Sequence, residues 1–150
     1  IMLRDGEGVA QDHEEANRWC QRASEAGSTA SMYDLGFQYE QGNGVAPSNR
    51  EAAKWYRRAA EAGNVDAMVN LGYLLENGNG VDQDYGEAFQ WYQRAAEAGD
   101  SVGMRNLGVM YENGWGTRRN LNLAEEWYEK AHQAGEESAL DDLNRVRKKS

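Results

Sequence analysis

Two histidines and one acidic stretch are the residues in this chain whose types could support metal binding or general acid–base catalysis. Asp82, Asp84 and Glu87 are spaced like part of a calcium loop, but the glycine that such a loop needs at its sixth position is absent. His13 and His132 lie far apart in non-equivalent sequence contexts, so we expect both on the surface rather than in a catalytic or metal site. The sequence therefore predicts no catalytic residue, no metal and no cofactor, and a protein that is not an enzyme.

A longer pattern runs through the whole chain. Its glycines and tryptophans recur every 36 residues, as Gly27, Gly63, Gly99 and Gly135, and as Trp19, Trp55, Trp91 and Trp127. A fixed period of this size indicates a repeat array. The sequence predicts a single domain over 1–150, with a partial repeat at 1–27, full repeats at 28–63, 64–99 and 100–135, and a C-terminal capping helix at 136–150. It leaves open whether a longer array precedes the partial repeat.

Each full repeat is predicted to contain two helices. The first, over 29–41 in the first full repeat, carries one apolar stripe and ends at the turn glycines Gly42 and Gly44. The same turn is predicted at 6–9 in the partial repeat. A further glycine recurs inside the helix, first as Gly36, where it costs about 1 kcal/mol against alanine. We therefore expect another backbone or a tryptophan to come close to it.

The second helix of each repeat is predicted to begin after a capping residue and to end at the periodic glycine. Its predicted N-caps are Asp12, Ser48, Asp84 and Asn120, and a glutamate three residues later predicts a capping box in the first three. The tryptophans are predicted to form the packing spine between helices, so Trp91→Ala should cost about 3–5 kcal/mol. Cys20 replaces the tyrosine that follows the tryptophan elsewhere, which predicts a packed, unreactive thiol and leaves the chain without a disulfide.

The overall charge excludes some classes of partner. The chain carries 16 Lys and Arg residues against 25 Asp and Glu residues, a net charge of −9, which disfavours nucleic acid and anionic membranes. There is no run of about 18 apolar residues, so no membrane insertion is predicted, and no signal peptide is visible. We interpret the basic residues at the C-terminus, Arg145, Arg147, Lys148 and Lys149, as a solvated end or a favourable helix C-terminus rather than a binding patch.

These motifs together resemble a known family. Leu-Gly-x-x-Tyr, Gly-x-Gly-Val, a capping acid and Ala-x-x-Trp-Tyr-x-x-Ala-Ala-x-x-Gly at a 36-residue period are similar to the Sel-1-like repeat (SLR) family, a relative of the tetratricopeptide repeats. The resemblance implies an all-α fold, an α/α right-handed superhelical solenoid of TPR-like helix-turn-helix repeats. It also implies an adaptor or scaffold, often bacterial. One cysteine-rich branch is credited with binding or cleaving β-lactams, but its repeats each carry a disulfide that this chain lacks.

The side of the first helices opposite the apolar stripe is the predicted binding surface. At about 100° per residue, positions 30, 33, 34, 37 and 41 share this side, and their residues vary between repeats while the stripe does not. The resemblance places this side on the concave face. We predict that a protein or peptide partner binds along Tyr33, Phe37, Val69, Asn70, Tyr73, Arg105, Asn106 and Val109. The alternative is that some of these aromatic residues pack against the next repeat.

Three points stay open at this stage. Two other functions are weighed. The family resemblance leaves a binder of small molecules or cell-wall fragments, β-lactams included, and the open N-terminal repeat beside Trp19 leaves an array that self-associates there. Trp115, in an otherwise polar turn, is either a partner anchor or is folded back over the neighbouring glycines. The compartment, bacterial cytoplasm or periplasm, is not determined.

Overall fold

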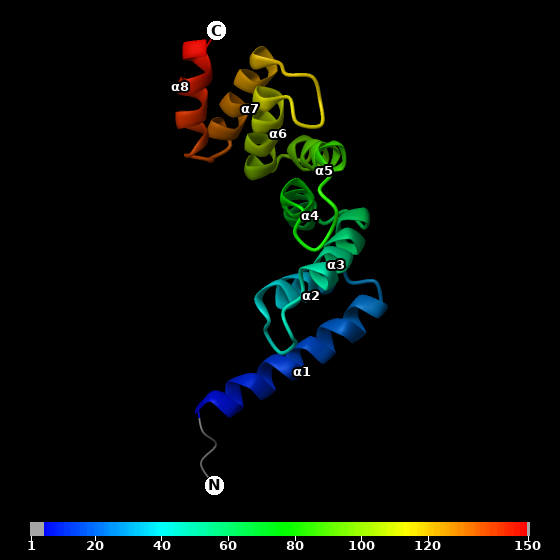
Figure 1. Ribbon diagram of the computed structural model, residues 1–150. Helices are drawn as coiled ribbons and strands as arrows, with labels where there is room; N and C mark the ends of the chain where they lie inside the picture. The colour runs from blue at the N-terminus through cyan, green and yellow to red at the C-terminus, as the bar shows by residue number, and fades with distance from the viewer. Residues whose placement is uncertain (1–4, 150) are drawn as a thin grey trace.

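The computed structural model describes residues 5–149, with side chains from Asp12 onward, and this part of the chain forms eight α-helices. They are α1 (Asp5–Glu25), α2 (Thr29–Gln41), α3 (Asn49–Glu61), α4 (Val65–Asn77), α5 (Tyr85–Glu97), α6 (Ser101–Asn113), α7 (Leu121–Gln133) and α8 (Ala139–Lys149). Residues 1–4 of the predicted partial repeat, and Ser150 of the predicted capping helix, lie outside the described residues. In Figure 1 the helices stack in order from α1 to α8, with the ends of the chain at opposite ends of an elongated array.

The packing is that of a solenoid. Each helix makes its main contacts with the helices next to it in sequence. The buried apolar residues form one cluster that extends from α3 to α6 and a second between α7 and α8. Such an array has no centre that all repeats share, so each repeat is stabilised by its own helix pair and by its neighbours. The predicted all-α solenoid is confirmed.

The predicted N-caps of the second helices are confirmed in the three full repeats. Ser48, Asp84 and Asn120 each accept a hydrogen bond from the backbone N–H three residues later. The reciprocal half of the predicted capping box is wrong. The backbone N–H of Ser48 donates to the carbonyl oxygen of Tyr39 (2.8 Å), and that of Asp84 donates to the carbonyl oxygen of Leu75 (2.9 Å). The backbone N–H of each capping residue therefore donates to a carbonyl oxygen near the end of the first helix, and not to the glutamate side chain as predicted.

The partial repeat at the N-terminus departs from the prediction. The turn predicted at 6–9 and the N-cap predicted at Asp12 are both wrong, because α1 is one unbroken helix through these positions. In a full repeat, this turn rests on the helix of the repeat before it. A Cβ added to Gly80, for example, would collide with the backbone of Asn49 in α3. Among the described residues no helix precedes α1, so nothing there holds such a turn and the segment continues as helix.

Tyrosines, not tryptophans, form the packing spine inside each repeat. Tyr56, Tyr92 and Tyr128 are completely buried, with 0% of each side chain exposed. The tryptophans one position earlier range from 6% exposed at Trp91 to 62% at Trp19. The predicted tryptophan spine therefore holds at Trp91, which belongs to the interior cluster, but it does not extend along the array, because Trp127 is only half-buried and Trp19 is exposed. A tyrosine carries its apolar ring inward and still offers a hydroxyl that needs a hydrogen-bond partner in the interior.

The recurring glycine inside each first helix makes room for that tyrosine. A Cβ on Gly36 would lie 2.5 Å from Cδ1 of Tyr56, and a Cβ on Gly72 would lie 2.6 Å from Cε1 of Tyr92. Gly108 has the same relation to Tyr128. The predicted close approach is confirmed, but the group that approaches is the tyrosine ring of the same repeat.

Candidate functional site

A glutamate on the first helix of each repeat receives the hydroxyl of the buried tyrosine. The Tyr56 hydroxyl donates to Oε2 of Glu40 (2.5 Å), and the Tyr92 hydroxyl donates to Oε2 of Glu76 (2.8 Å). Burial first, and the neighbouring carboxylate second, raise the pKa of both tyrosines, which therefore remain protonated donors. The sequence analysis missed this pair, although the glutamate recurs four residues after the internal glycine in every full repeat.

In the third full repeat the same pair is joined by the C-terminal helix. Glu112 is 5% exposed and accepts the Tyr128 hydroxyl at 2.6 Å. It also accepts hydrogen bonds from Nη2 of Arg145 (2.7 Å) and Nζ of Lys149 (3.1 Å) on α8. These donors, Arg145 above all, lower the pKa of Glu112 to about 2. Of the two interpretations of the basic C-terminus, the favourable helix C-terminus is confirmed, since Arg147, Lys148 and Lys149 lie in the last turn of α8. The solvated end is wrong for Arg145 and Lys149, which pair with the buried carboxylate of Glu112, and for Arg147, which pairs with Glu125.

Two of the eight predicted partner-binding residues are well exposed. Phe37 on α2 is 44% exposed and Tyr73 on α4 is 53% exposed. The two hold equivalent positions one repeat apart. Val109, at the equivalent position on α6, is half-buried and packs against the cluster between α7 and α8. The exposed aromatic surface therefore belongs to α2 and α4 and ends at α6.

Other predicted residues take part in contacts between repeats. Tyr33 is half-buried, its ring centroid lies 5.7 Å from that of Tyr56, and its hydroxyl accepts a hydrogen bond from Nδ2 of Asn70 at 3.4 Å. Val69 is half-buried against the interior cluster. The Tyr33 ring thus lies against Tyr56 of its own repeat, and its hydroxyl meets Asn70 of the following repeat, so Tyr33 contacts the next repeat through this hydrogen bond.

A similar contact accounts for Arg105. Its Nε donates to Oδ2 of Asp142 on α8 at 2.6 Å. Arg105 and Asp142 stand in the same relation as Tyr33 and Asn70 two repeats earlier. Part of the variation on this face therefore reflects the residue that each position meets in the next repeat. Asn106 lies on the same face of α6 and is half-buried.

The last helix buries one of its two leucines and leaves the other in water. Leu143 is 3% exposed, as the apolar stripe of a first helix requires, but Leu140 is 41% exposed. Asp142 is buried with it, held by Arg105 and by Nη1 of Arg145 at 2.9 Å. An acid inside the contact is tolerated because two guanidinium groups satisfy it.

Trp115 is folded back onto α5, the second helix of the preceding repeat. Its ring is stacked on Tyr85 of α5, with the centroids 5.1 Å apart and the planes 8° from parallel. Of the two alternatives for this residue, the folded one is correct, and the partner is an aromatic ring rather than the turn glycines. Stacking of this kind contributes about 0.5–1.5 kcal/mol beyond the area buried.

The two histidines and the single cysteine lie on separate helices. His13 and His132 are exposed, on α1 and α7. Cys20 is half-buried, which raises the pKa of its thiol and agrees with the predicted low reactivity. Among the described residues, no group of three or more His, Cys, Asp and Glu side chains is arranged to hold a metal ion. None of the described helices has the length and apolar character needed to cross a membrane.

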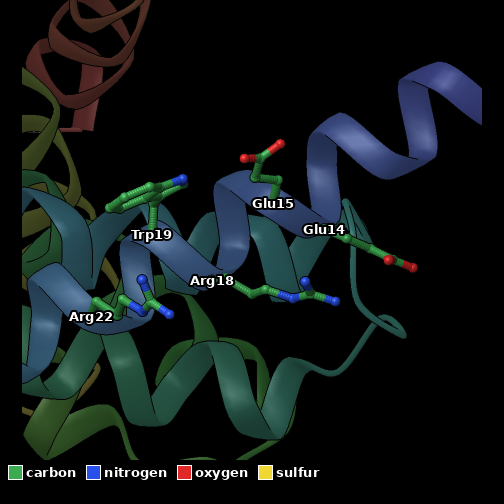
Figure 2. Close-up of a pocket in the computed structure, with 5 residues that line it drawn as sticks. All are labelled: Glu14, Glu15, Arg18, Trp19 and Arg22. Carbon is green, nitrogen blue, oxygen red and sulfur yellow. The ribbon is translucent and has the colours of Figure 1, made fainter.

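The outer side of α1 carries a hollow that the sequence analysis missed. It is lined by Glu14, Glu15, Arg18, Trp19 and Arg22, which project from successive turns of the helix in Figure 2. The guanidinium carbon of Arg22 lies 5.5 Å from the centroid of the Trp19 ring, within the range of a cation–π contact. A second hollow surrounds Trp55, the equivalent residue of the next repeat. Both were missed because the tryptophans were predicted to be buried.

Comparison with known proteins gives a consistent result. The Sel1 repeat family model matches residues 1–28, 29–64, 65–100 and 101–136, each boundary one residue after the periodic glycine. A crystal structure of a Sel1 repeat protein from Oxalobacter formigenes is 38% identical with a TM-score of 0.83, and the match covers 87% of this chain and 54% of that one. No curated protein matches the chain.

Two further solved structures share the fold. A protective antigen present in uropathogenic Escherichia coli strains, which displays an SLR fold, is 37% identical with a TM-score of 0.83, over 86% of this chain and 28% of that one. Helicobacter pylori cysteine rich protein B is 26% identical with a TM-score of 0.70, over 90% of this chain and 97% of that one. The chain thus spans about half the length of the Oxalobacter protein and under a third of the Escherichia coli antigen.

Proposed function

The chain belongs to the Sel1 repeat family, whose members generally serve as protein-interaction scaffolds, and we propose that it is a non-enzymatic adaptor for a protein or peptide partner. The partner lies along the side of α2, α4 and α6 that is opposite their buried apolar stripe, here called the first-helix face. Phe37 and Tyr73 are its centre, with the half-buried Val109 beyond them.

The exposure of Phe37 and Tyr73 carries this proposal. Large aromatic side chains at equivalent positions of two neighbouring repeats leave 44% and 53% of their surfaces in water. Fully burying one such side chain contributes about 1.5–3 kcal/mol, and aromatic residues are enriched among the residues that dominate protein interfaces. The fold itself does not need them at this position, since Val109 occupies it in the third full repeat. A partner that covers both rings gives their presence a reason.

The remaining predicted residues surround this centre. Asn70 and Asn106 offer side-chain amides on the same face, which suit hydrogen bonds to the backbone of a bound segment. Tyr33, Val69 and Arg105 support the face through their contacts between repeats and border it. We expect substitutions at these three to reduce stability as well as binding, so they are unsuitable as a first test.

The test is partner capture by a double variant. We expect Phe37→Ala/Tyr73→Ala to lose the partner that the wild-type protein retains in crosslinking and pull-down experiments. Trp19→Ala/Leu140→Ala is the matched control, because it removes two exposed apolar side chains elsewhere, 62% and 41% exposed. Undiminished capture by the Phe37/Tyr73 variant, with the control also unchanged, would remove the first-helix face from the proposal.

The two alternative functions of this chain are open to direct measurement. A binder of small molecules or cell-wall fragments would show a thermal shift or turnover with β-lactams, which we do not expect. Self-association would use the outer side of α1, where Trp19 is exposed, and light scattering that finds only monomer at high concentration would exclude it. No observation on the described residues favours either over the adaptor.

A further inference from the structure

We propose that the first-helix face selects a cationic partner, a segment whose Lys or Arg side chains bind the carboxylates of Glu40 and Glu76 while its apolar side chains cover Phe37 and Tyr73. This inference rests on the proposed function and specifies the chemistry of the partner. It comes from a glutamate that occupies the same position in three repeats, and among the described residues only the third of these glutamates pairs with cationic side chains.

Glu112 shows what this carboxylate binds when cations are within reach. It keeps the tyrosine hydroxyl as a donor and adds Arg145 and Lys149 from α8, at 2.7 and 3.1 Å. With both in place its side chain is only 4% exposed. A helix of the same chain therefore lies against the third copy of the site and supplies it with two positive charges.

Glu40 and Glu76 hold the equivalent positions on α2 and α4 and accept the same tyrosine hydroxyls. The residues that stand in the places of Arg145 and Lys149 are uncharged there. They are Tyr73 and Asn77 beside Glu40, and Val109 and Asn113 beside Glu76. Among the described residues neither carboxylate forms an ion pair, although both are half-buried.

The charge and the chemistry of these carboxylates favour a cationic partner. An ionised carboxylate accepts about four hydrogen bonds, and burial reduces the number that water can supply. A Lys or Arg side chain of the partner would therefore add charge-assisted hydrogen bonds to each of these half-buried carboxylates. Asp34 and Asp66 are exposed on the same face and extend its negative potential. The chain as a whole carries −9, which accelerates the approach of a basic segment.

The repeat geometry also constrains the partner. Glu40 lies on α2 and Glu76 on α4, and the two helices meet through the hydrogen bond between Asn70 and Tyr33. A partner that binds both carboxylates therefore crosses from one repeat to the next and needs at least two cationic residues, with apolar residues near them.

Selection from a random peptide library displayed on phage tests this directly, with the immobilised wild-type protein as target. We expect enriched peptides to contain Lys or Arg together with apolar residues. Their affinity should fall about tenfold for Glu40→Gln/Glu76→Gln, in which glutamine still accepts the tyrosine hydroxyls, and it should fall with added salt. Glu97→Gln/Glu126→Gln is the control, since it removes the same charge from exposed positions on α5 and α7 and should leave the affinity unchanged.

Enrichment of acidic or uncharged peptides, no enrichment at all, or an equal loss of affinity in the control variant would each overturn the inference. Circular dichroism of the Glu40→Gln/Glu76→Gln variant separates lost binding from lost folding. Peptides that depend on Phe37 and Tyr73 but not on the two carboxylates would overturn the inference and leave the proposed function standing. Peptides and partner that bind Phe37→Ala/Tyr73→Ala as well as wild type would overturn the proposed function itself.

Discussion

The tyrosines and the tryptophans of this array are adjacent in the sequence, yet they differ in how uniformly they are buried. All three tyrosines, at 56, 92 and 128, are 0% exposed, whereas the exposure of the tryptophans falls from 62% at Trp19 to 6% at Trp91. Each tyrosine is enclosed by the glycine and glutamate of its own repeat, which are the same in every full copy. A contact between residues of the same repeat is therefore the same in every full repeat of the array.

The tryptophans depend on what lies around them. The indole N–H of Trp91 donates to Oε1 of Glu87 at 3.3 Å, and Arg57 of the preceding repeat donates to the same oxygen. The equivalent glutamate beside Trp55 is paired with Lys54 instead. A basic residue three positions on lies over each of the four periodic tryptophan rings, 4.4–5.5 Å from its centroid. Contacts between repeats change wherever the neighbouring residue changes.

The largest expected effect is at the centre of the tyrosine spine. Tyr92→Ala should lower the free energy of unfolding by about 3–5 kcal/mol, because it removes a ring that is 0% exposed and leaves a cavity in the interior. Cys20→Ala, at the equivalent position of the partial repeat, should cost less than about 1 kcal/mol, because Cys20 is small and half-buried. Chemical denaturation of both variants makes the measurement. Equal losses of stability would show that Cys20 supports the partial repeat as strongly as Tyr92 supports its own.

The tryptophans should give a graded result. Trp91→Ala should cost about 3 kcal/mol, the lower end of the range expected from the sequence, while Trp19→Ala should cost less than about 1 kcal/mol. The reason is their difference in exposure, 6% against 62%. Thermal unfolding of the two variants side by side measures it. Equal losses of stability in the two variants would show that each tryptophan, like each tyrosine, is held mainly by contacts within its own repeat.

A smaller loss is expected from adding a methyl group at the internal glycine. Gly72→Ala should destabilise the protein by about 1–3 kcal/mol, because its Cβ would lie 2.6 Å from Cε1 of Tyr92. In a Tyr92→Ala background the same change should instead stabilise by up to about 1 kcal/mol, since only the helix propensity of alanine remains. Denaturation of the four proteins in this double-mutant cycle tests the coupling. Additive effects would contradict a direct contact between the two residues.

The mildest effect separates the third tyrosine–glutamate pair from the first two. The pKa of Glu112 is lowered from 4.5 to about 2 by Arg145, Tyr128 and Lys149. A lowered folded-state pKa stabilises above the unfolded value, so this contribution is present at pH 5 and is lost as the pH falls from 4.5 to 2. Because Arg145 is about half exposed, we expect about 1–2 kcal/mol after solvent screening.

The matching measurement is urea denaturation between pH 5 and pH 2 of the wild type and of Glu112→Gln. The variant should be less stable at pH 5 and should lose less stability on acidification, because it has no proton to bind at this position. Glu126→Gln, on the exposed side of α7, controls for the general effect of removing one acid. Parallel pH profiles for the wild type and Glu112→Gln would show that Glu112 does not carry this dependence.

Local signals account for what could be predicted at the level of single helices. The apolar stripe and the terminating glycines predicted a helix over 29–41, and α2 spans these residues. Ser48, Asp84 and Asn120 cap the following helices for the same reason, since an N-cap acts on the backbone three residues away. Where the required neighbour lies outside the segment, local signals fail, as they did at Asp12 in α1.

The candidate binding surface was only partly predictable. The 3.6-residue period placed Phe37 and Tyr73 opposite the buried stripe, and both are exposed. The same reasoning could not show that Tyr33 meets Asn70 or that Arg105 meets Asp142, because each partner lies in the next repeat of the sequence. Variation between repeats marks both kinds of position alike, so only the structure separates the exposed ones from the paired ones.

By itself the sequence determined the repeat period, the class of fold and most helix ends, because these depend on residues within a few positions of one another. The tertiary structure decided which of two adjacent aromatic residues forms the spine, which carboxylate finds a cation, and where the basic C-terminus lies. Both residues of Trp55-Tyr56 are large and apolar enough to be buried, and periodicity assigns them to the same side of the helix. Only the packing of a tyrosine ring on a glycine, with its hydroxyl on a glutamate, distinguishes them.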